Sequence, residues 1–369
     1  MRRRAIWVAC LCVSFLATEA AWAGRKADDV LKLVKQLRDK DPEVRAEAAW
    51  NIGEMVEKDA VPALRAALEQ AVPALAAALK DKQAPVRANA AATLGRIGPP
   101  AANAASPALR EALMDRDGGV RLNVVASLRV LGAEPSELAP ALREVLNDPD
   151  GEKRVAAAAA LKQLGVGAAQ DILPAIARGL KDKDAEVRSQ AVEQLRGMKA
   201  QTAEIVPVLL EAVRNSDSHV RSTAIRMLGA ARPPIKEAVP TLTAALTDKD
   251  ASVREAAASC LGRLGASAKE AVPALVQVLA QDGSADVRKS VATALGELGL
   301  VAKAALPALL QSLQQDKSGP VRSEAATALG EMGPVAKEAI PALNAALNDP
   351  DGHVKVAARN ALFRLDPKR

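Results

Sequence analysis

An apolar residue followed by a basic one recurs along the chain at a nearly constant interval. The basic residues are Arg45, Arg87, Arg121, Arg154, Arg188, Arg221, Arg254, Arg288, Arg322 and Lys355. Their successive spacings are 42, 34, 33, 34, 33, 33, 34, 34 and 33 residues, so only the first is irregular. A fixed period of about 20 to 50 residues is typical of repeat architectures. The sequence therefore predicts an array of about ten repeats rather than two or three compact domains.

Each repeat reads as two helices, as residues 267–299 illustrate. Ser267 and Glu270 predict a capping box at the start of the first helix. The second helix carries an apolar stripe at helical spacing: Val287, Val291, Leu295 and Leu298. Gly299 follows it, where glycine commonly ends a helix. Ala and Leu favour helices, whereas strand-forming aromatic residues make up only 1% of the chain. The fold class is therefore all-α, an α-solenoid of antiparallel helix pairs that bury their apolar faces by stacking.

The long first interval contains a duplicated segment. Residues 61–64, Val-Pro-Ala-Leu, are repeated as residues 72–75, eleven positions later. Eleven residues make about three helical turns, so the insertion can lengthen a helix without rotating its apolar face. We expect one extended helix near residues 59–80, bent near Pro73.

The first residues have the pattern of a secretory signal peptide. Three arginines precede a short apolar stretch, and Ala21-Trp22-Ala23 provides small residues before a cleavage site. The apolar stretch is shorter than the roughly 20 residues that span a bilayer. We expect residues 1–23 to be removed, leaving residues 24–369 as one exported solenoid, periplasmic or secreted, with no membrane span. Only Cys260 would then remain of the three cysteines, so no internal disulfide is expected.

The consensus PALxxALxDxDxxVRxxAAxALGxLG over residues 28–369 resembles the HEAT repeat, most closely the HEAT-like variety named after phycobilisome lyases. The resemblance implies a right-handed superhelix whose second helices line the concave side. It also implies a structural ladder in which a turn Asp and the helix Arg hydrogen-bond within and between repeats. The turn residues that match are Asp39, Asp81, Asp115, Asp148, Asp182, Asp248, Asp282, Asp316 and Asp349, with Asn215 as the one departure.

A second aspartate follows the first by two residues in most repeats. It occurs at Asp41, Asp117, Asp150, Asp184, Asp217, Asp250 and Asp351. An Asp at this place can accept a hydrogen bond from the first free backbone N–H groups of the second helix. We expect these residues to cap the second helices.

The residues that could carry chemistry are few and isolated. His219 and His353 occupy equivalent turn positions four repeats apart, too far to share a metal. Cys260 has no histidine near it in sequence and reads as a small packing residue. No glycine-rich phosphate loop is present, and the formal net charge of +6 is mild for 369 residues. We therefore expect no catalytic residues, no cofactor, no metal and no nucleic-acid partner.

The repeats differ most at positions one, two and five after the basic residue, which should face the concavity. Trp50, Leu122 and Val155 occupy these positions in early repeats, and polar residues such as Glu193, Arg226, Glu255, Lys289 and Glu324 occupy them later. Because exposed Trp is enriched at binding hot spots, we interpret the early positions as an apolar docking patch. A simple cover for the N-terminal end of the stack is the alternative for Trp50.

These observations favour a monomeric, non-catalytic scaffold that binds a protein partner whose identity the sequence does not reveal. The alternative is an accessory or chaperone-like subunit that presents a client to an enzyme. Bilin-lyase activity is disfavoured because those proteins act on cytoplasmic subunits, whereas this chain carries an export signal.

Overall fold

The computed structural model describes residues 26–56, 62–99, 101–196, 198, 204–231 and 234–366. These residues form helices, turns and short connections without strands, and they build an α-solenoid of ten helix pairs. The predicted signal peptide, with Cys10 and Cys12, lies outside the described residues, so its cleavage stays a prediction. The chain divides into two compact units, residues 1–175 and 176–369, with the boundary inside one helix. The expectation of one continuous solenoid from residue 24 also stays a prediction.

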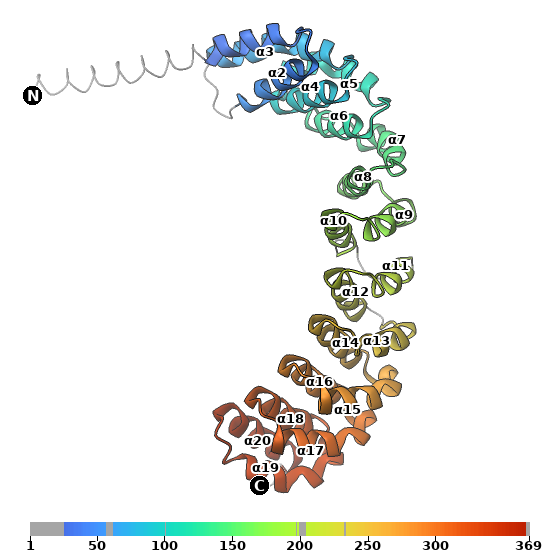
Figure 1. Cartoon of the computed structure of the whole chain (residues 1–369), viewed down its shortest axis with the longest axis vertical. Helices are drawn as coiled ribbons and strands as arrows, with labels where there is room; N and C mark the ends of the chain where they lie inside the picture. The colour runs from blue at the N-terminus through green and yellow to red at the C-terminus, as the bar shows by residue number, and fades with distance from the viewer. Residues whose placement is uncertain are drawn as a thin grey trace, which may run out of the picture. The chain divides into compact units, whose positions relative to one another are not determined.

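The first unit contains four repeats and the start of the fifth. Its first repeat pairs a helix at residues 26–36 with α2 (Pro42–Glu54). The next three pairs are α3 (Pro62–Ala78) with α4 (Ala84–Ile97), η1–α5 (Ala101–Ala105 and Ser106–Ala112) with α6 (Gly118–Val130), and α7 (Pro135–Val145) with α8 (Gly151–Gln163). Figure 1 shows α3, α5 and α7 in one row and α2, α4 and α6 in a second row.

The second unit continues the same alternation. The boundary lies in α9 (Ala169–Leu180), which is followed by α10 (Ala185–Arg196), α11 (Ile205–Ala212) and α12 (Ser218–Ala230). The seventh and eighth repeats comprise η2 (Lys236–Ala238), α13 (Val239–Ala245), α14 (Ala251–Arg263), η3 (Gly265–Ala271), α15 (Val272–Gln281) and α16 (Ala285–Leu298). The last two comprise η4 (Gly299–Ala305), α17 (Leu306–Gln315), α18 (Gly319–Glu331), η5 (Gly333–Ala339), α19 (Ile340–Ala346) and α20 (Gly352–Leu365).

The core consists of aliphatic residues at the predicted stripe positions. Val287, Val291 and Leu295 of α16 are each at most 1% exposed, and Leu298 is 5% exposed. They pack against the first helix of the same repeat and against the neighbouring second helices α14 and α18. Each pair is therefore stabilised by its neighbours, as the repeat pattern predicts.

The ends of the helices match the sequence signals at the second helix and differ at the first. All seven second aspartates accept a hydrogen bond from a backbone N–H of the helix that follows, so their predicted capping role is confirmed. Gly299 ends α16 with φ at 57°, a conformation that glycine adopts without strain. The predicted capping box is wrong: Ser267 and Glu270 lie in the 3-10 turn η3, and α15 begins at Val272 without a side-chain cap.

The duplicated segment forms a single helix over its described part. α3 runs from Pro62 to Ala78 with Pro73 inside it, and both copies of the Leu, Leu64 and Leu75, are at most 1% exposed. Both Leu residues therefore lie on the buried face, as expected for an insertion of about three turns. Residues 57–61, where the extended helix was expected to begin, lie outside the described part of the chain.

One stretch, Ala285–Gln315, is long and apolar enough to cross a membrane by length and composition. It consists of α16, η4 and α17, and the backbone at Ala302 is not helical, with φ −92° and ψ 17°. Its apolar residues Val291, Leu295 and Leu309 are completely buried between repeats. The stretch is therefore the second helix of one repeat, a 3-10 turn and the first helix of the next repeat rather than one straight span.

Candidate partner-binding surface

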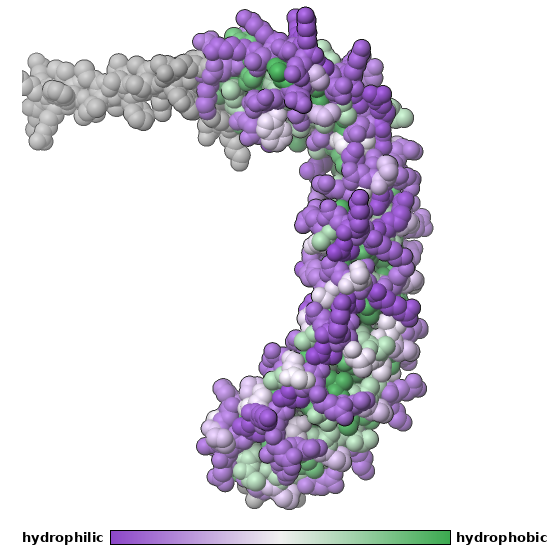
Figure 2. All heavy atoms as spheres, viewed as in Figure 1, coloured by the Kyte–Doolittle hydropathy of each residue, from purple (hydrophilic) through white to green (hydrophobic). Residues whose placement is uncertain are grey.

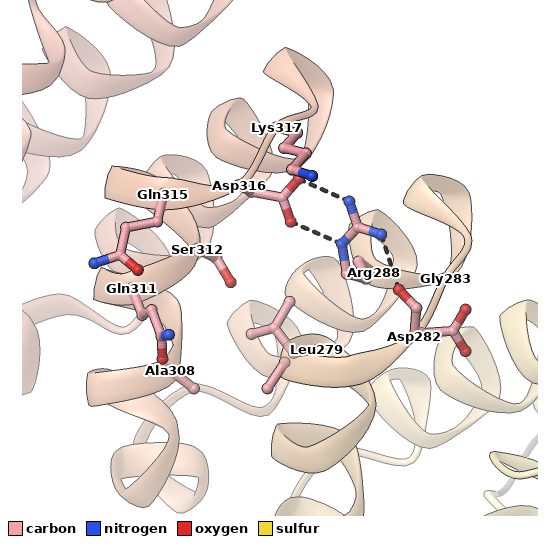
Figure 3. Close-up of a pocket in the computed structure, with 11 residues that line it drawn as sticks. Leu279, Asp282, Gly283, Arg288, Ala308, Gln311, Ser312, Gln315, Asp316 and Lys317 are labelled. Carbon is pink, nitrogen blue, oxygen red and sulfur yellow. Dashed lines mark hydrogen bonds and ion pairs between the residues drawn. The ribbon is translucent and has the colours of Figure 1, made fainter.

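The polar ladder has a fixed geometry that Arg288 illustrates (Figure 3). Its Nη1 donates to the backbone oxygen of Asp282 in its own turn, at 2.9 Å. Its Nε and Nη2 donate to the two carboxylate oxygens of Asp316 in the next repeat, at 2.7 and 2.8 Å. The Asp316 carboxylate also accepts the backbone N–H of Ser318, at 2.9 Å. One arginine therefore closes its own turn and fixes the register of the next repeat through a two-bond fork.

The same fork occurs in six pairs of neighbouring repeats. The pairs are Arg45–Asp81, Arg87–Asp115, Arg221–Asp248, Arg254–Asp282, Arg288–Asp316 and Arg322–Asp349. In each, the side chains are at most 17% exposed. The hydrogen bond from Arg45 is the largest cause that holds the pKa of Asp81 below its usual range, and Arg322 acts in the same way on Asp349.

Two middle arginines, Arg121 and Arg188, depart from this geometry. Arg121 donates to the backbone oxygen of Asp115, but within the described residues no bond joins it to Asp148, and its Nε is buried without a partner. Arg188 pairs with Asp217, through one carboxylate oxygen at 3.1 Å, because Asn215 donates instead to the backbone oxygen of Leu180. Arg154 donates to the backbone oxygens of Asp148 and Pro149 in its own turn.

Three further ladder residues are Asp39, Lys355 and Asp182. Asp39 accepts the backbone N–H of Asp41 and stands before the first arginine of the series. Lys355 lies in α20, and Asp182 lies in the turn that Arg188 closes through the Asp182 backbone oxygen.

Open grooves lie between successive first helices, beside the ladder. The groove between α15 and α17 has a volume of about 460 Å³ and is lined by Leu279, Gln311, Gln315 and Lys317 together with the Arg288 fork (Figure 3). A groove of about 390 Å³ lies in the equivalent place between α9 and α11. Their recurrence at the same place indicates that they follow from repeat packing. Neither groove contains an arrangement of groups with a specific chemistry.

Trp50 is an exposed aromatic side chain on the second helix of the first repeat. It is 45% exposed on α2, and the guanidinium of Arg96 from α4 lies over its ring, 4.9 Å from the ring centre. Arg96 also pairs with Glu54, one turn after Trp50. A Trp ring held by a cation on one side can present its remaining surface to a partner at little cost in side-chain entropy.

The other two predicted residues lie differently. Leu122 of α6 is half-buried, so part of its side chain reaches the surface. Val155 of α8 is 1% exposed, and its assignment to the docking patch is wrong. The position after the basic residue therefore differs in burial between repeats: it is core in α8 and half-buried in α6. The structure therefore does not join Trp50, Leu122 and Val155 into one exposed patch.

Sequence reasoning missed two residues of this surface, Arg96 and Val130. Both lie nine places after a basic residue, in α4 and α6, and Val130 is 52% exposed. The opposite charges of Glu54 and Arg96 at this place in consecutive repeats were the available signal. We define the Trp50 surface as Trp50, Arg96, Ala126 and Val130 with the exposed part of Leu122. Figure 2 shows that one face of the molecule is mostly hydrophilic.

The isolated histidines and cysteine occupy structural positions. The backbone N–H groups of His219 and His353 bond the capping Asp217 and Asp351, and both side chains are exposed. Cys260 is 3% exposed, and burial raises the pKa of its thiol to about 12, which disfavours the reactive thiolate. In the described part of the chain, no group of three His, Cys, Asp or Glu side chains is placed to hold a metal ion.

The family profile described as HEAT repeats matches the chain in seven overlapping segments. The segments are residues 30–129, 106–196, 139–218, 173–235, 206–296, 239–330 and 272–363. Together they extend over residues 30–363, nearly the whole of the described solenoid. A search of curated proteins found no match.

Solved structures share the same architecture. An engineered protein is 25% identical with a TM-score of 0.51 over 92% of this chain and 99% of its own. An importin beta crystal structure is 16% identical with a TM-score of 0.56, over 96% of this chain and 53% of its own. Kap95p, solved in a study of its binding to RanGDP, is 16% identical with a TM-score of 0.51. The match covers 94% of this chain and 56% of the Kap95p chain. The chain spans about half the length of these last two proteins, and at this identity the likeness shows the fold alone.

Proposed function

Because the chain belongs to the HEAT-repeat family, we propose that it is a non-catalytic scaffold that binds a protein partner at the Trp50 surface. HEAT-repeat solenoids commonly serve as protein-interaction scaffolds, which supports the general role. The observation that carries the specific proposal is the exposed Trp50 ring with Arg96 packed on it. Interface cores are enriched in Trp and Arg, and the two residues are already held in a defined geometry.

The proposal also specifies the side of the solenoid where the partner binds and the cell compartment where the protein acts. The Trp50 surface belongs to the second helices, which line the concave side in proteins of this repeat type, so the partner would bind in the concavity. Residues 1–23 would direct export, and the scaffold would act in the periplasm or outside the cell. Mass spectrometry of the protein from the exported fraction should give a chain that begins at Gly24. A chain that keeps residues 1–23 would contradict the compartment without affecting the binding surface.

Site-directed crosslinking tests the binding surface. A photo-crosslinking residue at position 126 lies on the Trp50 surface, and the same residue at Asn360 lies at the equivalent exposed position of the last repeat. We expect a crosslinked product of defined mass in the exported fraction from position 126 and none from position 360. Equal products from both positions would contradict a specific surface. A range of products that changes with growth conditions would favour the chaperone-like alternative, in which many clients bind transiently.

A paired substitution separates binding from folding. Trp50→Ala with Val130→Asp should abolish the crosslink from position 126, while the circular dichroism spectrum and the Tm stay close to those of the parent. Ile52→Ala provides the comparison, because Ile52 is completely buried in the same helix and its loss should lower the Tm. If Trp50→Ala alone lowers the Tm as much as Ile52→Ala does, Trp50 is a cover for the end of the stack.

A further inference from the structure

The residue eight places after the basic residue, which we name the eighth position, faces the next second helix. It is glycine in six repeats: Gly53, Gly95, Gly229, Gly262, Gly296 and Gly330. A methyl group added to Gly262 would lie 2.8 Å from the Cα of Ala294, and one added to Gly296 would lie 3.0 Å from the Cα of Ala328. Glycine at the eighth position therefore lets two helix backbones approach more closely than any side chain would allow.

The six repeats with glycine at the eighth position are also the six that show the two-bond fork among the described residues. For example, Gly296 faces Ala328 across the α16–α18 joint, and the arginine of the same repeat forms the Arg288–Asp316 fork. The residue opposite the glycine is buried in these joints, at 1% exposure for Ala294 and 0% for Ala328. Close backbone approach and the ladder thus occur together in each of these pairs.

The joint between α6 and α8 lacks both features. Its eighth position is Arg129, which is exposed, and the residue opposite, Ala160, is only half-buried. Arg121 and Asp148 are both present, yet no bond joins them in the structure as described, and the Nε of Arg121 is buried without a partner. The two helices also contact each other along less of their length than α4 and α6 do.

The joint between α10 and α12 shows the same combination. Its eighth position is Arg196, and Arg188 reaches Asp217 through one carboxylate oxygen in place of the two-bond fork. The α6–α8 and α10–α12 joints thus lack both the glycine and the two-bond fork, although either could have been absent alone.

We propose that the interface between α6 and α8 is a compliant joint of the solenoid, held open by Arg129 at the eighth position. A long side chain at this position keeps the helix backbones apart, so Asp148 stays out of reach of Arg121. Two polar links cross the joint. Lys153 pairs with Asp117 at 3.1 Å through side chains that are 28% and 30% exposed, and Arg129 Nη1 donates to Gln163 Oε1 at 3.3 Å on the exposed side. Both lie at the surface and restrain the joint weakly. Fewer buried contacts and a missing fork lower the cost of changing the angle between the helices. The α10–α12 joint is a second, milder instance.

The test measures the spread of distances across the joint. Spin labels at positions 92 and 159 span α4 to α8, and labels at positions 293 and 360 span α16 to α20, where both joints have glycine. Cys10 and Cys12 are replaced by serine, and Cys260 is left in place because it is buried. In double electron–electron resonance measurements, we expect the first pair of labels to give a clearly broader distance distribution than the second pair.

Substitution of one residue should then close the joint. Arg129→Gly should narrow the distribution of the first pair to that of the second and shift its mean inward by about 2 Å, within the range of interaxial distances that side chains set. Arg129→Lys is the matched control and should leave the broad distribution unchanged, because it keeps a long cationic side chain.

A second readout follows the ladder itself. In the parent, Arg121→Ala should leave the urea midpoint of unfolding nearly unchanged, whereas in the Arg129→Gly protein it should lower the midpoint, because the Arg121–Asp148 fork has then formed. The proposal is overturned if the two label pairs give equal widths in the parent. It is also overturned if Arg129→Gly leaves the first distribution broad, or if Arg129→Lys narrows it equally.

Discussion

The α16–α18 joint and the α6–α8 joint contain the same ladder residues and use them differently. In the first, Arg288 and Asp316 form two bonds of 2.7 and 2.8 Å. In the second, Arg121 and Asp148 stand at the same places in the repeat and no bond joins them in the described structure. The difference lies at Gly296 in one joint and Arg129 in the other. The presence of a charged pair in a repeat motif therefore does not ensure an ion pair, since the backbone spacing decides whether the two groups meet.

The comparison also separates two contributions to stability that usually appear together. Helix stacking buries apolar area in every repeat, whereas the fork contributes only where both charged groups are positioned in advance and shielded from water. The side chains of Arg288 and Asp316 are 15% and 8% exposed, so their bonds are screened less than those of a surface pair. The four predictions that follow change one side of the comparison at a time.

The largest expected effect comes from removing a ladder arginine. Arg288→Ala leaves the carboxylate of Asp316 largely buried without its partner and opens the turn at Asp282. We expect a loss of about 2–4 kcal/mol in the free energy of unfolding, as for the removal of one partner from a buried pair. Arg121→Ala should cost less than about 1 kcal/mol, because this arginine forms no fork. Urea unfolding of both variants, followed by circular dichroism, measures the difference; equal losses would show that the fork itself contributes little.

The sequence predicted much of this architecture because repetition constrains it. The spacing of the basic residues gave the ten helix pairs, and the second aspartates such as Asp217 and Asp250 cap their helices as expected. The start of the first helices was not predictable from Ser267, because a 3-10 turn takes the place of the capping box. Local hydrogen-bonding signals identify a cap only when the preceding backbone is extended, as it is before the second helices.

The candidate surface was less predictable than the fold. Trp50 is exposed as the sequence suggested, but Val155 is buried, although it stands at the same place in its repeat as the half-buried Leu122. Arg96 was missed because its partners, Trp50 and Glu54, lie in another repeat. The loss of the fork at Arg121 depends on Arg129 in the same way. Contacts between repeats thus depend on the distance between neighbouring helices, which the sequence of one repeat alone does not determine.

A smaller effect is expected from adding one methyl group at a closely packed joint. Gly262→Ala places a Cβ 2.8 Å from the Cα of Ala294 and 3.1 Å from its Cβ. The backbone must move, so we expect a destabilisation of about 1–3 kcal/mol despite the better helix propensity of Ala. Arg129→Ala is the corresponding change at the α6–α8 joint. It should change the free energy of unfolding by no more than about 0.5 kcal/mol. Thermal and urea unfolding measure both, and a stable Gly262→Ala protein would show that the joint can open without cost.

Acid should weaken the fork-bearing joints through their carboxylates. The hydrogen bond from Arg322 lowers the pKa of Asp349 in the folded state. The stabilisation is therefore present above the unfolded pKa of about 3.9 and is lost as the pH falls through the folded value. Asp349→Asn should lower the free energy of unfolding by about 1 kcal/mol near pH 7. The difference in this free energy between the variant and the parent should shrink as the pH falls below about 4. Glu144→Gln, at an exposed carboxylate, is the control and should show a smaller difference at neutral pH. A pH-independent effect of Asp349→Asn would mean that the charge of Asp349 does not stabilise the joint.

The smallest effect is expected at the eighth position of α20, because the described residues place no further second helix against it. Phe363 occupies this place and is 69% exposed, in contrast with the buried Gly330 one repeat earlier. Phe363→Ala should change the free energy of unfolding by less than about 0.5 kcal/mol, since little packing is lost. Gly330→Ala is the matched comparison and should destabilise, because its new Cβ would lie 2.8 Å from the Cα of Ala361. Unfolding curves of the two variants, measured together, decide whether the eighth position matters only where another helix must approach. A large loss for Phe363→Ala would show that this ring packs within its own repeat, and the size limit at Gly330 would then need a cause other than the neighbouring helix.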